Sequence, residues 1–77
     1  MAVFTIQDLQ AIAREVIGDR DIVLTPDMTA ADVPGWDSLN HTLIAMEIGA
    51  HLDREVDAEK LAQQPTFGAL IDHINAG

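Results

Sequence analysis

Apolar residues recur at intervals of three and four near the start of the chain, and this spacing places them on one face of a helix. The stripe consists of Ile6, Leu9, Ile12, Ala13, Val16 and Ile17. Thr5 precedes it as an N-cap, Asp8 supplies the acidic partner of a capping box, and Gly18 stands where a helix stops. The pattern therefore predicts a first helix from Ile6 to Ile17.

Residues 19–36 lack this spacing. Pro26, Pro34 and Gly35, together with several Asp and Thr residues, argue against a long helix and predict a long loop. Ordered loops of this length are uncommon in compact domains and often carry function. We expect the loop to be anchored on the helices by four apolar residues, Val23, Leu24, Met28 and Val33.

The remainder of the chain predicts three more helices. The first of them runs from Ser38 to about Leu52, with Asp37 as its N-cap. A short helix is expected around Ala58 to Gln63. After Pro65, Thr66 is the natural N-cap of a last helix. Its apolar stripe consists of Phe67, Leu70, Ile71 and Ile74. The predicted fold class is therefore all-α, a four-helix bundle with three longer helices, one short helix and a long loop between helices one and two.

The helix predicted over 38–52 has two apolar faces. At roughly 100° per residue, one face carries Ile44, Ile48 and Leu52, with His41 and Ala45 beside it. The other face carries Leu39, Leu43, Met46 and Ala50. A helix on the surface of a domain needs only one apolar stripe to join the core. We expect one stripe to stay at least partly exposed as a binding surface; the alternative is a central helix with both stripes in the core.

Composition narrows the function classes. A chain of 77 residues forms a single domain, here 1–77, with little room for a deep catalytic pocket. It has no cysteine, which excludes disulfides and thiolate catalysis. With no signal-peptide pattern and no apolar run of about 20 residues, a cytoplasmic protein is expected. Thirteen acidic against four basic residues give a net charge of −9. Nucleic acid and membrane partners are therefore not expected, and basic protein partners are.

Two kinds of catalytic site can be set aside. The three histidines, His41, His51 and His73, are too scattered for a recognisable zinc set, and no metal site is expected. Ser38 and His41 would point about 60° apart on one helix, with no third group to orient the base. We therefore expect no hydrolase and no enzyme. His41 is instead expected to pack on the inner face of the helix with a hydrogen bond.

The start of the helix over 38–52 resembles a known family. Residues 35–41 read Gly-Trp-Asp-Ser-Leu-Asn-His. An Asp-Ser-Leu that opens a helix after a long loop, in an acidic chain of this size, is the signature of acyl and peptidyl carrier proteins. The expected order of helices is also similar to the carrier-protein fold, and the resemblance covers essentially the whole chain.

The resemblance implies a cofactor and a set of partners. Ser38 would be the hydroxyl to which a phosphopantetheinyl transferase attaches 4′-phosphopantetheine from coenzyme A, and Asp37 would help that enzyme to organise its magnesium ion. Leu39 would help to present the serine. The thiol of the cofactor would hold an acyl or aminoacyl group as a thioester, supplied by a loading ligase and passed to a downstream transferase or synthase.

The chain departs from the fatty-acid type of carrier along the same helix. Positions that are acidic in that type hold Asn40, Leu43, Gly49, Ala50 and His51. A specialised freestanding carrier, monomeric and with aminoacyl, hydroxyacyl or fatty acyl cargo, is therefore expected instead of a housekeeping one. The expected partner-binding residues are Leu39, Leu43, Met46, Asn40, Glu47 and Trp36.

Alternatives to the carrier interpretation remain open. Ser38 would then be an ordinary exposed hydroxyl or a helix cap, and Trp36 would pack the loop against the domain. The chain would be an unmodified helical interaction module that offers the Leu39/Leu43/Met46 stripe to a partner.

Overall fold

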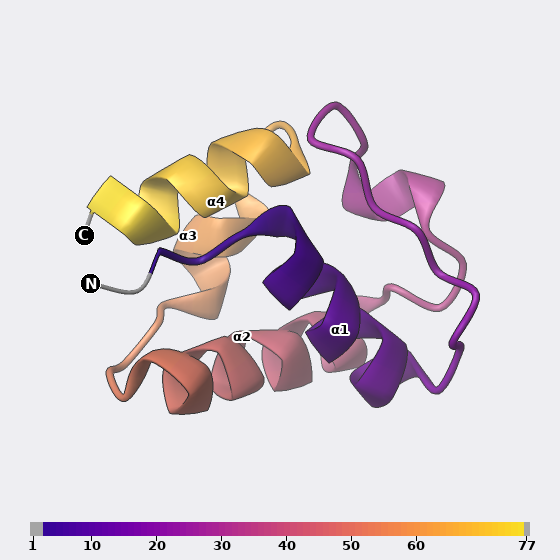
Figure 1. The fold of residues 1–77 in the computed structure, drawn as a ribbon, viewed down its shortest axis with the longest axis horizontal. Helices are drawn as coiled ribbons and strands as arrows, with labels where there is room; N and C mark the ends of the chain where they lie inside the picture. The colour runs from indigo at the N-terminus through magenta and orange to yellow at the C-terminus, as the bar shows by residue number, and fades with distance from the viewer. Residues whose placement is uncertain (1–2, 77) are drawn as a thin grey trace.

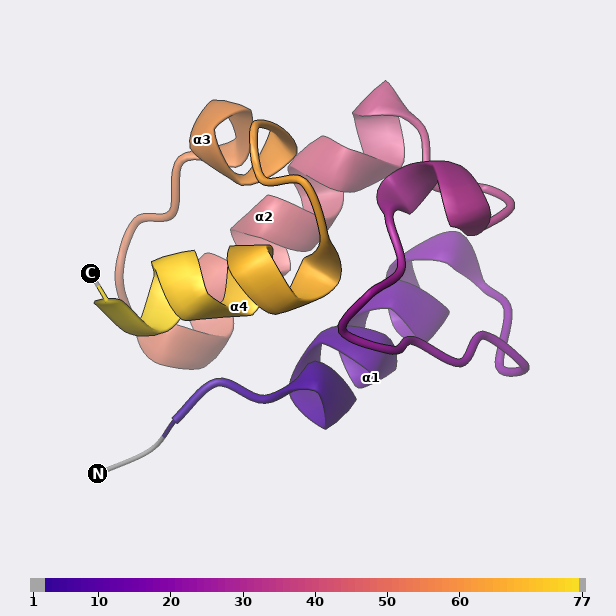
Figure 2. The same cartoon turned by 90° about the horizontal axis from the view of Figure 1, so that it is seen from above.

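The computed structural model describes residues 3–76, which form four α-helices and one turn of 3-10 helix (Figure 1). The elements are α1 (Ile6–Ile17), η1 (Ala30–Asp32), α2 (Ser38–Leu52), α3 (Ala58–Ala62) and α4 (Phe67–Ala76). The predicted all-α fold with three longer helices and a short one is confirmed. Helix α2 runs along one side of the bundle, and α1 and α4 lie across from it (Figures 1 and 2). The long loop between α1 and α2 lies at one end of the bundle.

Local capping signals set the ends of α1 where the sequence predicted them. The Asp8 amide donates to the Thr5 hydroxyl at 3.2 Å, and the Thr5 amide donates to the Asp8 carboxylate at 3.0 Å. This capping box satisfies two amides that have no partner within the helix. Gly18 ends α1 with φ = 82°, a left-handed conformation that glycine adopts without strain.

The two shorter helices are also capped by side chains. Asp57 accepts from the Glu59 amide at 2.9 Å at the start of α3, which ends at Ala62, one residue before the predicted Gln63. The Thr66 hydroxyl accepts from the Ala69 amide at 3.2 Å, which confirms the predicted start of α4. Because such caps act between neighbours in the sequence, they fix the helix ends independently of the tertiary packing.

One core lies between the helices and the long loop. Ile44 and Ile48 of α2 and Leu9 of α1 are at most 1% exposed. The buried residues are Phe4, Leu9, Ala13, Ile22, Leu24, Val33, Ile44, Ala45, Ile48, Leu61, Phe67, Leu70 and Ile74. Loop residues and all four helices therefore contribute to the same core.

The long loop is anchored by different residues than the sequence suggested. Leu24 and Val33 are buried and Met28 is half-buried, as expected, but Val23 is 62% exposed. Ile22 takes its place in the core. Residues 22–24 lie outside the helices, and their burial alternates, which places the side chain of Val23 on the opposite side from those of Ile22 and Leu24. The prediction for Val23 was wrong because apolar character alone does not indicate which side of such a segment faces the core.

Hydrogen bonds fix the loop at two places, near its start and near its middle. The Arg14 Nε donates to the Ile22 carbonyl at 2.7 Å, and the Leu24 amide donates to the Gln10 side chain at 2.9 Å. Near the middle of the loop, two carbonyls accept from amides of the first turn of α4. These bonds are Phe67 N to Met28 O at 2.9 Å and Gly68 N to Pro26 O at 2.8 Å.

Gly49 allows the chain to fold back closely after α2. A Cβ atom at this position would lie 2.7 Å from the Arg54 carbonyl oxygen, and the Arg54 amide donates to the Gly49 carbonyl at 3.0 Å. Alanine favours a helix over glycine by about 1 kcal/mol. Here we expect Gly49→Ala to destabilise the protein instead, by about 1–3 kcal/mol, because the backbone has to shift.

Urea unfolding, followed by the fluorescence of the single tryptophan, checks this expectation. The exposed neighbour provides the control, since Ala50→Gly should cost only about the 1 kcal/mol of helix propensity. A Gly49→Ala variant that is more stable than the native protein would show that the close approach at Arg54 does not constrain the turn.

Candidate functional site

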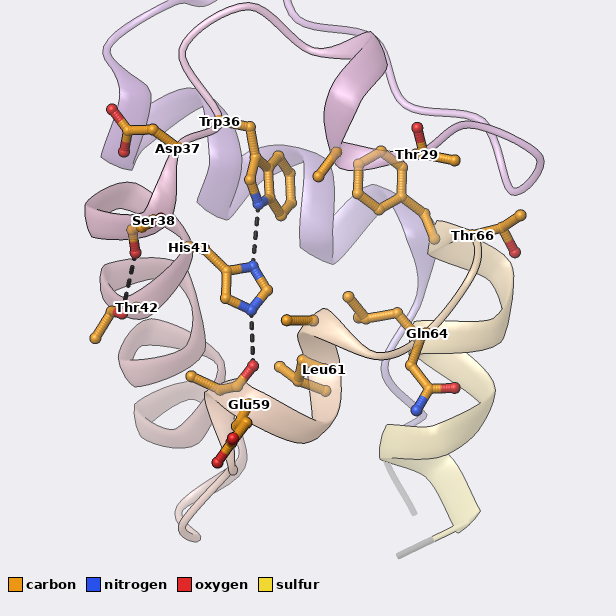
Figure 3. Close-up of a pocket in the computed structure, with 15 residues that line it drawn as sticks. Thr29, Trp36, Asp37, Ser38, His41, Thr42, Glu59, Leu61, Gln64 and Thr66 are labelled. Atoms are coloured by element: carbon orange, nitrogen blue, oxygen red, sulfur yellow. Dashed lines mark hydrogen bonds between the residues drawn. The ribbon is translucent and has the colours of Figure 1, made fainter.

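Ser38 is exposed at the first residue of α2. Asp37 caps the helix and accepts from the Asn40 amide at 2.8 Å. Among residues 3–76, no hydrogen bond engages the Ser38 hydroxyl, whereas the Ser38 carbonyl accepts from the Thr42 hydroxyl at 3.1 Å (Figure 3). The Ser38 hydroxyl is therefore accessible to another molecule at the positive end of a 15-residue helix.

A groove of about 640 Å³ opens beside Ser38. Its sides come from the start of α2, from η1, from α3 and from the start of α4 (Figure 3). Trp36, Leu61 and Phe67 give it apolar walls, while Thr29, Gln64 and Thr66 contribute polar groups. An arm attached near Ser38 would have an apolar surface within reach.

A bridge of hydrogen bonds crosses from the loop to α3 inside this groove. His41 Nδ1 lies 3.1 Å from Trp36 Nε1, and His41 Nε2 lies 2.8 Å from the Ala58 carbonyl oxygen. The expectation that His41 packs inward with a hydrogen bond is confirmed. Trp36 also stacks on Phe67, with ring centroids 4.8 Å apart, so it packs the loop against the domain. Whether Trp36 also contacts a partner stays a prediction.

The two apolar faces of α2 have different environments. Ile44, Ala45 and Ile48 are buried. On the other face, Leu39 is 69% exposed, Met46 66% and Leu43 38%. The expectation that one stripe stays exposed is confirmed, and the alternative in which both stripes are core is wrong. We call Leu39, Leu43 and Met46 the apolar stripe.

The other residues that the sequence assigned to partner binding lie near the stripe but differ in their contacts. Glu47 is exposed and is the only acidic residue within α2. Asn40 is half-buried, and its side-chain amide donates to the Gly35 carbonyl at 2.7 Å. Asn40 therefore fastens the end of the loop to α2, a role that the sequence did not indicate.

The α3 and α4 side of the groove was not predictable from the sequence. Ala58, Leu61, Thr66 and Phe67 looked like helix or cap residues, and only the fold brings them to Ser38. The one local signal was the Asp57 cap, which places Ala58 at the start of a helix. Across the described range, no cluster of His, Asp or Glu could hold a metal ion. No helix within 3–76 has the length and apolar character that crossing a bilayer requires.

Comparison with known families gives one finding. A family model described as "Phosphopantetheine attachment site" matches residues 7–74, which takes in almost all of α1 and α4 and everything between them. Neither the comparison with curated proteins nor that with solved structures gave a match.

The contribution of Asp37 as a cap can be measured separately from any other role. Asp37→Ala removes the bond to the Asn40 amide and should lower the free energy of unfolding by about 1 kcal/mol. Asp37→Asn keeps an oxygen acceptor and should change it by only a few tenths of that amount. Urea unfolding of the three proteins checks this, and equal stabilities would show that Asp37 does not cap α2 in solution.

Proposed function

The chain belongs to the phosphopantetheine attachment-site family, and we propose that Ser38 is the residue that carries the 4′-phosphopantetheine arm. As a member, the protein is a carrier that bears this prosthetic group and shuttles acyl intermediates, and it is not itself an enzyme. When bound, the arm supplies the thiol that holds cargo as a thioester. The observation that carries the proposal is the exposed hydroxyl of Ser38 at the start of α2, beside an apolar groove.

The chemistry around Ser38 fits a phosphodiester. Ser38 is the only serine in the sequence, so no other residue of this type competes for the attachment. A negatively charged phosphodiester on the first turn of α2 would lie at the positive end of the helix dipole, near backbone amides that have no partner within the helix. Since the chain has no cysteine, any thiol it presents must come from the arm.

Asp37 is proposed to assist the attachment. Only one of its carboxylate oxygens accepts from the Asn40 amide, so the carboxylate remains exposed next to Ser38. This exposure supports a role in organising the magnesium ion of the phosphopantetheinyl transferase. The Asp37→Asn variant, which keeps the cap, tests this role because modification should slow while stability is retained.

Carriers of this family are modified by phosphopantetheinyl transferases and interact with biosynthetic enzymes. We propose that these partners, including a loading ligase and a downstream transferase or synthase, dock on the apolar stripe. Glu47 would contact them at its edge, while Asn40 and Trp36 would contribute by fixing the loop beside Ser38. An exposed apolar surface next to the attachment point supports this assignment.

The character of α2 supports a specialised carrier over a housekeeping one. Glu47 is its only acid, so its exposed face offers apolar contacts where the fatty-acid type offers a row of charges. We propose that residues 1–77 work as one monomeric carrier domain in the cytoplasm, with an acyl or aminoacyl cargo. The second candidate is an unmodified interaction module, which the exposed stripe favours because its exposure does not depend on any modification.

Intact mass separates these two candidates. After incubation with coenzyme A and a broad-specificity phosphopantetheinyl transferase, we expect the native chain to gain one phosphopantetheine. Ser38→Ala should gain none, while Thr42→Ala, which removes another exposed hydroxyl one turn further along α2, should be modified normally. A native chain that stays unmodified with several transferases would favour the interaction module.

The apolar stripe is tested by a charge at its centre. We expect Leu43→Glu to reduce the kcat/KM of modification by the same transferase at least about fivefold, since burying a carboxylate in an apolar contact is unfavourable. Val23→Glu places the same charge on an exposed apolar residue outside α2 and serves as the control. Equal rates for the two variants would contradict docking through the stripe.

A further inference from the structure

His41 is the only residue whose side chain makes hydrogen bonds to both the loop and α3 within the described range. Trp36 belongs to the loop before α2, His41 to the first turns of α2, and Ala58 is the first residue of α3. Figure 3 shows the two hydrogen bonds of His41 as dashed lines on opposite sides of its ring, one of them to Trp36. The bridge thus runs across the boundary between α2 and α3 at the groove.

The direction of both hydrogen bonds follows from the chemistry of the partners. An indole N–H only donates, so His41 Nδ1 accepts from Trp36. A carbonyl oxygen only accepts, so His41 Nε2 carries the proton and donates to Ala58. Both ring nitrogens are therefore used, and the imidazole is held in one tautomer and one orientation.

Helix α3 depends on contacts of this kind for its position. It has five residues, far fewer than the roughly 12–15 that an isolated helix needs to be stable in water. The buried Leu61 and the bond from His41 to Ala58 hold it against α2. Of the three α-helices that line the groove, α3 is the shortest and depends most on contacts with the rest of the protein.

The groove leads directly to core residues. Leu61, Phe67 and Leu70 line it and are at most 4% exposed. Trp36 lies over Phe67, so the bridge links the ring that covers the core to the helix that borders it. Ile44 and Ile48 on the inner face of α2 are buried and do not line the groove. Movement of α3 away from α2 would give a chain in the groove access to that inner face, and it would have to break the bond at Ala58.

We propose that the Trp36–His41–Ala58 bridge is a latch that holds α3 against α2. Short cargo then stays in the groove beside Ser38, and a long apolar chain is buried against the inner face of α2 only when the latch opens. His41 is then a positioning residue that sets which cargo the protein shields from solvent. The proposal rests on attachment of the arm at Ser38 for its effect on cargo, but the latch itself exists in the unmodified chain.

The latch is tested first without any cargo. Trp36 is the only tryptophan, so its indole N–H gives a single side-chain resonance in an NMR spectrum of the ¹⁵N-labelled protein. We expect this proton to exchange with solvent about tenfold faster in His41→Leu, which removes the acceptor. His41→Gln, whose side chain offers both an acceptor and a donor, should restore most of the protection. His73→Leu, an exposed histidine on α4, is the control. Equal exchange in the native chain and His41→Leu would overturn the proposal.

The effect on cargo is tested on protein loaded with amide-linked analogues of an acetyl and a dodecanoyl chain. In the native protein we expect few nuclear Overhauser contacts from the dodecanoyl chain to Ile44 and Ile48, which are buried on the inner face of α2 and do not line the groove. In His41→Leu these contacts should become strong, and His41→Gln should behave like the native chain. The acetyl analogue should show the same nuclear Overhauser contacts in the native protein, in His41→Leu and in His41→Gln. Strong dodecanoyl contacts in the native protein, with the indole proton still protected, would overturn the proposal.

Two outcomes are kept apart by this design. Failure of Ser38 to accept the arm would count against the proposed function, while indole exchange in the unmodified chain would still decide whether the latch exists. If His41→Leu does not fold, Trp36→Phe removes the donor, keeps an aromatic ring over Phe67, and should give the same strong dodecanoyl contacts. A Trp36→Phe protein that excludes the chain as the native protein does would likewise overturn the latch.

Discussion

The placement of Ser38 depends on how the first turn of α4 satisfies its backbone amides. A helix begins with amides that lack intrahelical partners, and a long loop has carbonyls in the same position. Here the helix amides and the loop carbonyls pair with each other, because the amides of Phe67 and Gly68 donate to the carbonyls of Met28 and Pro26. The loop is thereby fixed at a point between η1 and α1 as well as at its ends. From that point the chain has little freedom before it enters α2.

The small size that limits the core also leaves apolar surface in solvent. A chain of 77 residues buries only about 60% of the surface that it exposes when unfolded. Helix α2 buries Ile44 and Ile48 and leaves the apolar stripe in solvent. The docking proposed above would let several enzymes recognise this one face in turn. Since Glu47 is the only acid within α2, the proposed recognition would depend mainly on apolar fit.

The helices and their ends were predictable because the relevant signals are local. The capping box of Thr5, the Asp37 cap and the Gly18 stop each act within a few residues, and all lie where the sequence placed them. The exposed face of α2 was not predictable in this way, because periodicity gives two apolar stripes without indicating which of them faces the core. The inward orientation of Val23 was predicted incorrectly, because the apolar character of a loop residue does not indicate which side of the loop faces the core.

The candidate site was predictable only on its α2 side. Ser38 and Asp37 belong to a recognisable motif, whereas the groove and the bond from His41 to Ala58 join residues 17 positions apart. No periodicity or spacing indicates that the start of a five-residue helix will lie against that histidine. The partner of Asn40 was missed for a similar reason, since the turn at Gly35 that exposes a carbonyl to it forms only in the folded loop.

The two ends of the described chain are fastened to each other far from Ser38. Phe4 and Asn75 exchange hydrogen bonds of 3.0 and 2.9 Å, and Phe4 packs against His51 near the opposite end of α2. His51 lies thirteen positions after Ser38 along α2, which corresponds to about 20 Å of helix. An affinity tag, a solid support or a fused enzyme joined to the chain next to Phe4 or Asn75 would therefore lie far from Ser38. The protein is therefore suited to being tethered at one end while Ser38 stays accessible at the other.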